Sequence, residues 1–227
     1  MVNWIFALAL EIPAIVLMFC LRPISFFWSL GPKGERKGPP ILLVHGYLHD
    51  SSAWIYHRWQ LKRHGYSQVY LLNLKPRFAS IAEYAKQIEA KASLIEKETG
   101  QNHLILIGHS MGGLVSAFYA TQLAPQGKVT DVITIGSPLA GTLMAKIGIG
   151  PAAREMERNS EFLKKLQIAI LSNRTIRFLS IATKTDQLVI PYTSGVIGDK
   201  CFIINNLCHV SLLYSPRVAK KIVSFLG

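Results

Sequence analysis

A pentapeptide with a central serine is the feature of this 227-residue sequence that points most plainly to chemistry. Residues 108–112, GHSMG, follow the apolar run Leu104–Ile107 and open a helical pattern. A G-x-S-x-G motif between a strand and a helix is typical of a nucleophile elbow, a sharp turn that exposes the serine hydroxyl. The flanking Gly108 and Gly112 leave room for neighbouring backbone. The motif predicts that Ser110 is a nucleophile, and the alternative is a glycine-rich turn with an incidental serine.

The elements that would position this serine alternate along the chain from Ile41 onward. Short apolar runs predict six strands, at Ile41–Val44, Gln68–Leu72, Leu104–Ile107, Val132–Ile135, Ile176–Ile181 and Cys201–Ile204. Helical patterns lie between them, at Ala53–Arg63, Ile81–Glu98, Met111–Leu123, Pro151–Ile170 and Leu212–Phe225. This alternation predicts an α/β fold of about six mostly parallel strands with helices on both faces. Ligands of such sheets bind beyond the carboxyl ends of the strands.

Five segments together resemble the α/β-hydrolase fold, and within it the small bacterial lipases and esterases. These are HGY after the first strand, GHSMGG, GSPLAGT after the fourth strand, TKTDQLVIP, and His209 before the last helix. The chain is also similar to the lipase-like core of enzymes that deacylate glycolipid anchors. The resemblance covers about Ile41 to Gly227, and it implies a serine, acid, histidine triad in that chain order. The resemblance implies a minimal member of the superfamily, in which an early pair of strands is usually missing.

The family order selects one of seven histidines as the base that takes the proton of Ser110. Only His209 follows the fifth and sixth predicted strands, at the carboxyl end of the sheet. The acid that would orient it follows by elimination among four aspartates. Asp50 precedes the serine, and Asp131 and Asp199 enter strands at the opposite end of the sheet. Asp186 remains, in a loop at the correct end, and its alternative role is to cap a turn.

An oxyanion hole is expected beside the serine, because ester attack creates a negatively charged tetrahedral oxygen. One donor would be the backbone N–H of Met111, directly after the nucleophile. In lipase-like relatives the second donor follows the HG pair, which here indicates Tyr47. His45 is expected to fix this loop by hydrogen bonding.

The first 30 residues differ in composition from the rest of the chain. Residues 4–21 contain one charge, Glu11, and one proline. Eighteen residues are at the lower limit for a membrane-spanning helix. We expect residues 1–30 to form a membrane anchor, either spanning or interfacial, and the alternatives are a helix packed on the domain and a signal peptide. A linker is predicted at 31–40 and a hydrolase domain at 41–227.

The net charge of +12, from 25 basic and 13 acidic residues, attracts anionic partners. We find no nucleic-acid-binding motif, so an anionic membrane surface is the expected partner and nucleic acid is not expected. Basic residues after the apolar segment weakly favour a cytoplasmic location of the domain, and a secreted form stays open. Nothing in the sequence calls for a metal or organic cofactor. Cys201 and Cys208 are expected either to pair in an oxidising compartment or to remain free thiols.

Residues 139–175 form an insertion before the fifth predicted strand and are a candidate lid. Its second helix, capped by Asn159 or Ser160, would have an apolar face. That face would consist of Leu163 and of the i, i+4, i+8 series Phe162, Leu166 and Ile170. That face would cover a lipid chain or pack in the core as an ordinary crossover helix.

The predicted function is a serine ester hydrolase of lipase or esterase type that acts through an acyl-enzyme, on lipid or phospholipid esters. The alternatives are an acyltransferase or thioesterase with the same triad, or a non-catalytic lipid-binding protein that keeps the fold.

Overall fold

The computed structural model describes residues 2–24, 37–198 and 200–227. Its centre is a six-stranded sheet in the order β2-β1-β3-β4-β5-β6, with every neighbouring pair parallel. The strands are β1 (Ile41–Val44), β2 (Val69–Leu72), β3 (Leu104–His109), β4 (Val129–Ile135), β5 (Arg177–Thr183) and β6 (Cys201–Ile204). The predicted parallel α/β fold is confirmed. Most of the predicted linker and Asp199 lie outside the described residues.

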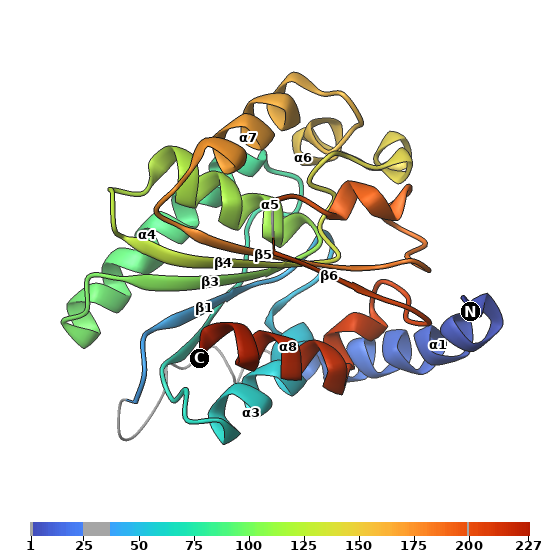
Figure 1. Cartoon of the computed structure of the whole chain (residues 1–227), viewed down its shortest axis with the longest axis horizontal. Helices are drawn as coiled ribbons and strands as arrows, with labels where there is room; N and C mark the ends of the chain where they lie inside the picture. Colours follow the sequence, from blue (N-terminus) through green and yellow to red (C-terminus); the bar gives the residue numbers. More distant parts are fainter. Residues whose placement is uncertain (1, 25–36, 199) are drawn as a thin grey trace.

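Helices cover both faces of the sheet (Figure 1). One face carries α4 (Ile81–Thr99), α5 (Met111–Phe118), α6 (Pro151–Glu155) and α7 (Glu161–Ser172). The other face carries α1 (Trp4–Leu21), α3 (Ile55–Arg63) and α8 (Pro216–Leu226). Each layer buries its own apolar cluster against the sheet. The strands are therefore covered on both sides, which explains their continuous apolar sequences.

Local signals set the ends of the helices. Ser80 and Glu83 form a capping box at the start of α4, and Gly100 ends that helix in a left-handed conformation. The predicted helix 151–170 is divided into α6 and α7, because Asn159 has a φ of 65° and the Ser160 side chain caps the second helix. The Met111–Leu123 pattern continues from α5 into one π-helical turn, Tyr119–Leu123.

Short helical turns join the longer elements at the carboxyl edge of the sheet. These are Arg22–Ile24 (η1), Ser51–Trp54 (η2), Leu143–Ile147 (η4), Tyr192–Gly195 (η5) and Ser211–Tyr214 (η6). Helix α1 contacts η2 and η6, so the N-terminal segment lies beside the loops that follow β1 and β6. Among the described helices, α1 is the one that is long and apolar enough to cross a membrane by length and composition.

Candidate active site

Ser110 lies on a strained turn between β3 and α5. Its backbone has φ 55° and ψ −128°, a conformation that is rare for a residue with a side chain. The turn is held from both sides, since the Ser110 N–H donates to the carbonyl of Ile135 at 2.9 Å and Gly113 N–H donates to the Ser110 carbonyl at 3.1 Å. The neighbouring strand β4 thus fixes the serine at the carboxyl edge of the sheet, as a nucleophile elbow requires.

Two glycines of the elbow are dictated by close backbone contacts. A Cβ atom on Gly108 would collide with the backbone of Gly112 and Gly113. A Cβ atom on Gly112 would collide with the carbonyls of Val44 and His45 at the end of β1. The motif glycines therefore bring α5 close to the sheet, as the sequence predicts.

Asp186 and His209 form a buried pair at the same edge of the sheet. His209 Nδ1 lies 3.0 Å from both carboxylate oxygens of Asp186. Asp186 Oδ1 also accepts the backbone N–H groups of Leu188 at 2.9 Å and Val189 at 2.8 Å. Asp186 thus combines its alternative role, capping a turn, with the expected contact to the histidine. This contact sets the proton on Nδ1 and leaves Nε2 as the basic atom of the ring.

The backbone of His209 is held by two side chains that the sequence analysis did not assign. His209 N–H donates to Gln187 Oε1 at 3.0 Å. The buried His109 donates from Nε2 to the His209 carbonyl at 3.1 Å, and the two imidazole centroids are 4.6 Å apart. The position of His109 inside the elbow was the sequence signal that could have indicated its contact with His209. For Gln187, the one such signal was that it directly follows Asp186.

Burial and charge act in opposite directions on the imidazoles of this edge. Burial lowers the pKa of His209, but the Asp186 carboxylate, its hydrogen bond and Glu11 raise that pKa above its usual value. Burial, the nearby His209 and His49 lower the pKa of His109 well below its usual value. His209 is therefore the imidazole of this pair that is suited to exchange protons near neutral pH.

The loop after β1 lies beside the elbow. Its hydrogen bonds fix His45, which donates from Nδ1 to the Gly46 carbonyl at 2.9 Å and accepts the Leu74 N–H at Nε2 at 2.9 Å. Tyr47 lines a pocket together with Ser110, and its hydroxyl donates to the Ile149 carbonyl at 2.7 Å. Met111 is buried at the first position of α5. Both predicted oxyanion residues are thus next to the serine.

A pocket of about 260 Å³ opens at Ser110. Its wall is mostly apolar. Besides Tyr47 and Pro138, two segments supply the wall, with Met144, Ala145, Ile147, Ala153 and Met156 on one and Leu188 and Val189 on the other. The candidate lid contributes only its first half. The apolar stripe of α7 is buried in the core through Leu163, Leu166 and Ile170, as an ordinary crossover helix would be.

Other candidates take structural positions. Asp50 caps η2 and pairs with Arg22, and Asp131 in β4 pairs with Arg177. Within the described residues no disulfide joins Cys201 to Cys208. Within the described ranges, no group of three or more His, Cys, Asp or Glu side chains has the arrangement of a metal site.

No hydrogen bond joins Ser110 Oγ to His209 in the part of the chain that the structure describes. Such bonds are often long without substrate and shorten in the reacting complex.

The chain is similar to a known family and to several known proteins. Residues 78–197, more than half of the chain, match the family of the PGAP1-like alpha/beta domain. Triacylglycerol lipases of Pseudarthrobacter phenanthrenivorans and Burkholderia plantarii are each 36% identical over 121 residues, which are 47% of this chain. The match spans about a third of those two relatives, 35% and 31% of their lengths.

A solved structure shares the fold over a larger part of the chain. The mature lipase BlEst2 of Bacillus licheniformis has a TM-score of 0.69 at 17% identity, over 87% of this chain and 97% of that one. Because this family model matches more than half of the chain, the chain belongs to the PGAP1-like alpha/beta domain family, and its fold agrees with that lipase and with the α/β-hydrolase superfamily.

Proposed function

We propose that this chain is a serine ester hydrolase of the lipase or esterase type. The observation that carries the proposal is the strained Ser110 at the mouth of an apolar pocket, on the same sheet edge as the buried Asp186–His209 pair. The two homologous triacylglycerol lipases support the reaction class. A fold by itself hosts many chemistries, so the site and not the fold carries the argument.

In the proposed reaction, Ser110 Oγ attacks the carbonyl carbon of the ester while His209 Nε2 takes the hydroxyl proton. The backbone N–H groups of Met111 and Tyr47 stabilise the tetrahedral oxyanion. The intermediate collapses when His209 returns the proton to the leaving alcohol, and an acyl-enzyme remains. Water then attacks the acyl carbon with His209 as base, and the acid is released from Ser110. Asp186 keeps the imidazole in the reactive tautomer and stabilises its charged form.

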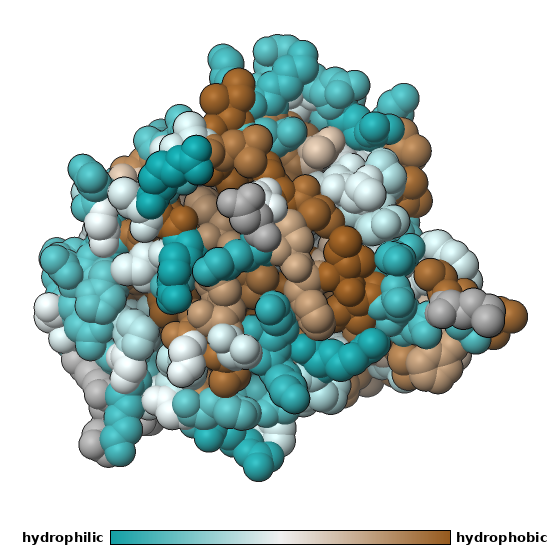
Figure 2. All heavy atoms as spheres, in the orientation of Figure 1, coloured by the Kyte–Doolittle hydropathy of each residue, from teal (hydrophilic) through white to brown (hydrophobic). Residues whose placement is uncertain are grey.

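The apolar wall of the pocket favours an acyl group over a charged substrate. Large apolar side chains are exposed around its mouth, namely Leu143, Ile147, Ile149, Leu188 and Ile190. Helix α1 also exposes Trp4, Ile5, Phe6, Leu8 and Ile12, and Figure 2 shows apolar surface at the end of the molecule where α1 begins. A surface of this kind, on a chain with a net charge of +12, is suited to an anionic lipid interface. We therefore propose lipid esters as the substrate class and a membrane surface as the place of action.

The test is hydrolysis of p-nitrophenyl esters, from acetate to palmitate, by the full chain in detergent micelles. Ser110→Ala should lower kcat by about 10³-fold or more, because the nucleophile is lost. Ser93→Ala removes an exposed serine of α4 whose hydroxyl donates to the Glu89 carbonyl, and it should leave turnover unchanged. A fluorophosphonate should label the wild-type chain and Ser93→Ala, but not Ser110→Ala.

Each alternative function predicts a different result. Equal turnover by Ser110→Ala, or no labelling of the wild type, would contradict the hydrolase and favour a lipid-binding protein. Transfer of the acyl group to added alcohols in preference to water would identify an acyltransferase, and a strong preference for thioesters would identify a thioesterase. A preference for acetate over long chains would contradict the lipid-ester part of the proposal.

A further inference from the structure

A buried carboxylate from α1 lies beneath the loop that carries His209. The Glu11 side chain is 2% exposed, although its helix is otherwise apolar and largely exposed. A carboxylate in such a position is costly unless several donors compensate it. The α1 residues that face the domain recur at helical spacing, at Ala7, Glu11, Ala14 and Met18, so Glu11 is at the centre of the docked face.

Three donors meet this carboxylate, and all are neutral groups of the catalytic loops. Val210 N–H donates to Oε1 at 2.7 Å and Ser211 N–H donates to Oε2 at 2.8 Å. The Gln187 side-chain amide donates to Oε1 at 2.6 Å. Val210 and Ser211 directly follow His209, and Gln187 directly follows Asp186. Glu11 therefore bridges the loops that carry the acid and the base.

The chain of contacts reaches the histidine itself. The same Gln187 side chain that donates to Glu11 accepts the His209 N–H at 3.0 Å. The backbone of His209 is thus tied to α1 from its own N–H through Gln187, and from the next two N–H groups directly. These bonds fix where the imidazole points, because they hold the residue on both sides of its Cα atom.

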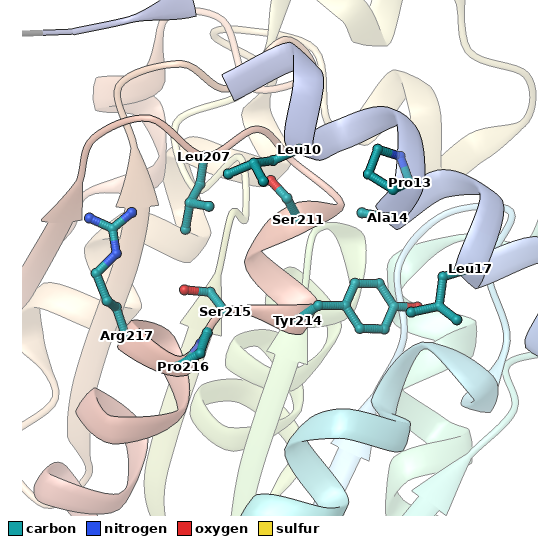
Figure 3. A pocket seen from close by; sticks show the side chains of 10 residues that line it. All are labelled: Leu10, Pro13, Ala14, Leu17, Leu207, Ser211, Tyr214, Ser215, Pro216 and Arg217. Carbon is teal, nitrogen blue, oxygen red and sulfur yellow. The ribbon is translucent and has the colours of Figure 1, made fainter. Parts of the chain in front are cut away.

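Apolar packing between α1 and the rest of the domain is limited. Figure 3 shows a pocket between α1 and the η6 turn, with Leu10, Pro13, Ala14 and Leu17 on the helix side. Its volume is about 420 Å³, so the two elements are incompletely packed beside Glu11. Two of the other docked residues are alanines, and alanine contributes little apolar area. The polar contacts of Glu11 are therefore a large part of what joins α1 to the catalytic loop.

From these contacts we propose that Glu11 is a positioning residue of the active site, through which the N-terminal helix holds His209 in place. The inference rests on the proposed hydrolase function. It assigns α1 a role in turnover besides membrane association, so that residues 41–227 without α1 would have a poorly positioned base.

The test compares Glu11→Gln with the wild type in detergent micelles, using p-nitrophenyl butyrate. Gln keeps the size of the side chain but lacks the charge, and it presents a donor where a second acceptor is needed. We expect kcat to fall about 10- to 100-fold with KM within about twofold, because small displacements of a reacting group have effects of this size. Fluorophosphonate should label the variant more slowly but to the same final stoichiometry, which separates mispositioning from unfolding.

The pH profile supplies a readout that a merely structural role would not change. The titratable groups that interact with His209 are Asp186, Glu11, His109 and His49, and the Cys208 thiol lies near Glu11 and Asp186. Glu11 favours the protonated imidazole, so its removal should move the acid limb of kcat/KM to lower pH. Gln187→Met breaks the link to the His209 N–H but keeps the Glu11 charge. It should lower kcat without moving that limb.

Glu83→Gln is the matched control, because its exposed carboxylate also accepts a backbone N–H, that of Ser80, but on the opposite face of the sheet. It should keep the wild-type kcat and pH profile. A wild-type kcat in Glu11→Gln would overturn the positioning role. The role would also be overturned if the variant lost labelling stoichiometry while each labelled site kept the normal turnover rate. A mature protein whose N-terminus lies beyond Glu11, read by mass spectrometry, would also overturn it. A wild type without Ser110-dependent turnover would instead overturn the proposed function and the inference with it.

Discussion

Helices α1 and α7 both carry many apolar side chains, yet they contact the domain in opposite ways. Helix α7 buries three large side chains, Leu163, Leu166 and Ile170, in the core. Helix α1 buries two alanines, Glu11 and Met18, and exposes most of its large side chains. An apolar sequence therefore does not by itself determine which face is docked. Burial depends on the opposing surface, which is an apolar core for α7 and a cluster of N–H donors for α1.

The largest difference is expected in stability. Leu166→Ala should lower the free energy of unfolding by about 2–5 kcal/mol, because it leaves a cavity at a side chain that is 1% exposed. Leu8→Ala on α1 removes a side chain that is 46% exposed and should change it by about 0.5 kcal/mol or less. Urea unfolding followed by circular dichroism measures both. Equal effects would contradict the difference between the two helices.

Acid should weaken the α1 side of the sheet before the α7 side. Burial lowers the pKa of His57, on α3, to about 4, and its ring donates to the Leu212 carbonyl in η6. In the unfolded chain the His57 imidazole binds a proton near pH 6.5, whereas in the folded chain it does so only near pH 4. The contribution of the neutral His57 to the free energy of unfolding is therefore complete above pH 6.5 and is lost as the pH falls towards 4. This contribution is ~3 kcal/mol.

Hydrogen exchange at pH 7 and pH 5 tests this order of opening. Amides of α3, α8 and η6 should lose protection at pH 5, while those of α4 and α7 keep more of theirs. His57→Gln should reduce the pH dependence. Uniform loss of protection on both faces would contradict the prediction, and so would an unchanged slope in the variant.

Membrane association should also differ between the two helices. Replacement of Trp4 and Phe6 by serine should weaken binding to phosphatidylglycerol vesicles about 10- to 100-fold, because each large side chain contributes ~1 kcal/mol or more when it enters the lipid interface. Ile168 and Leu171 are similarly exposed on α7, and serine at both positions should have little effect. Vesicle flotation measures the bound fraction. Loss of binding in the α7 variant alone would place the membrane contact on the other face.

The smallest expected effect is at the end of α1. Arg22 pairs with Asp50 at 3.3 Å and donates to the Leu48 carbonyl, but both charged side chains are partly exposed. Arg22→Ala should lower stability by about 0.2–1 kcal/mol, as expected for an exposed pair. Lys164→Ala on α7, which removes the more exposed pair with Glu161, should have a smaller effect still. Thermal unfolding at low and high salt measures both, since screening should reduce the Arg22 effect.

Much of the fold was predictable because its signals are local. The six strands were found within a few residues, since buried parallel strands are continuous apolar runs bounded by polar loops. The start of α4 was predictable from its capping box, which is formed by residues three apart. The elbow was predictable from its motif. Gly108 is required by the backbone of Gly112 and Gly113, which is local, whereas Gly112 is required by the distant carbonyls of Val44 and His45.

The roles of Ser110, Asp186 and His209 remain predictions, but their placement on one sheet edge follows from chain order in a parallel sheet. The division of α6 from α7 was indicated by the two candidate caps Asn159 and Ser160, and in the structure Ser160 is the cap while Asn159 has a left-handed conformation. The lid hypothesis was left open by the apolar stripe alone, because the same pattern serves a lid and a core helix. The structure packs that stripe in the core and leaves the first half of the segment at the pocket.

By itself, then, the sequence determined the parallel sheet, the elbow, the candidate triad and the apolar nature of residues 4–21. Tertiary structure alone decided which face of α1 is docked and why an acidic residue lies in it. Glu11 is about 200 residues from Val210 and Ser211, whose N–H groups it accepts. Backbone N–H groups are present at every residue except proline, so no residue type in the sequence marks which of them will meet a distant carboxylate.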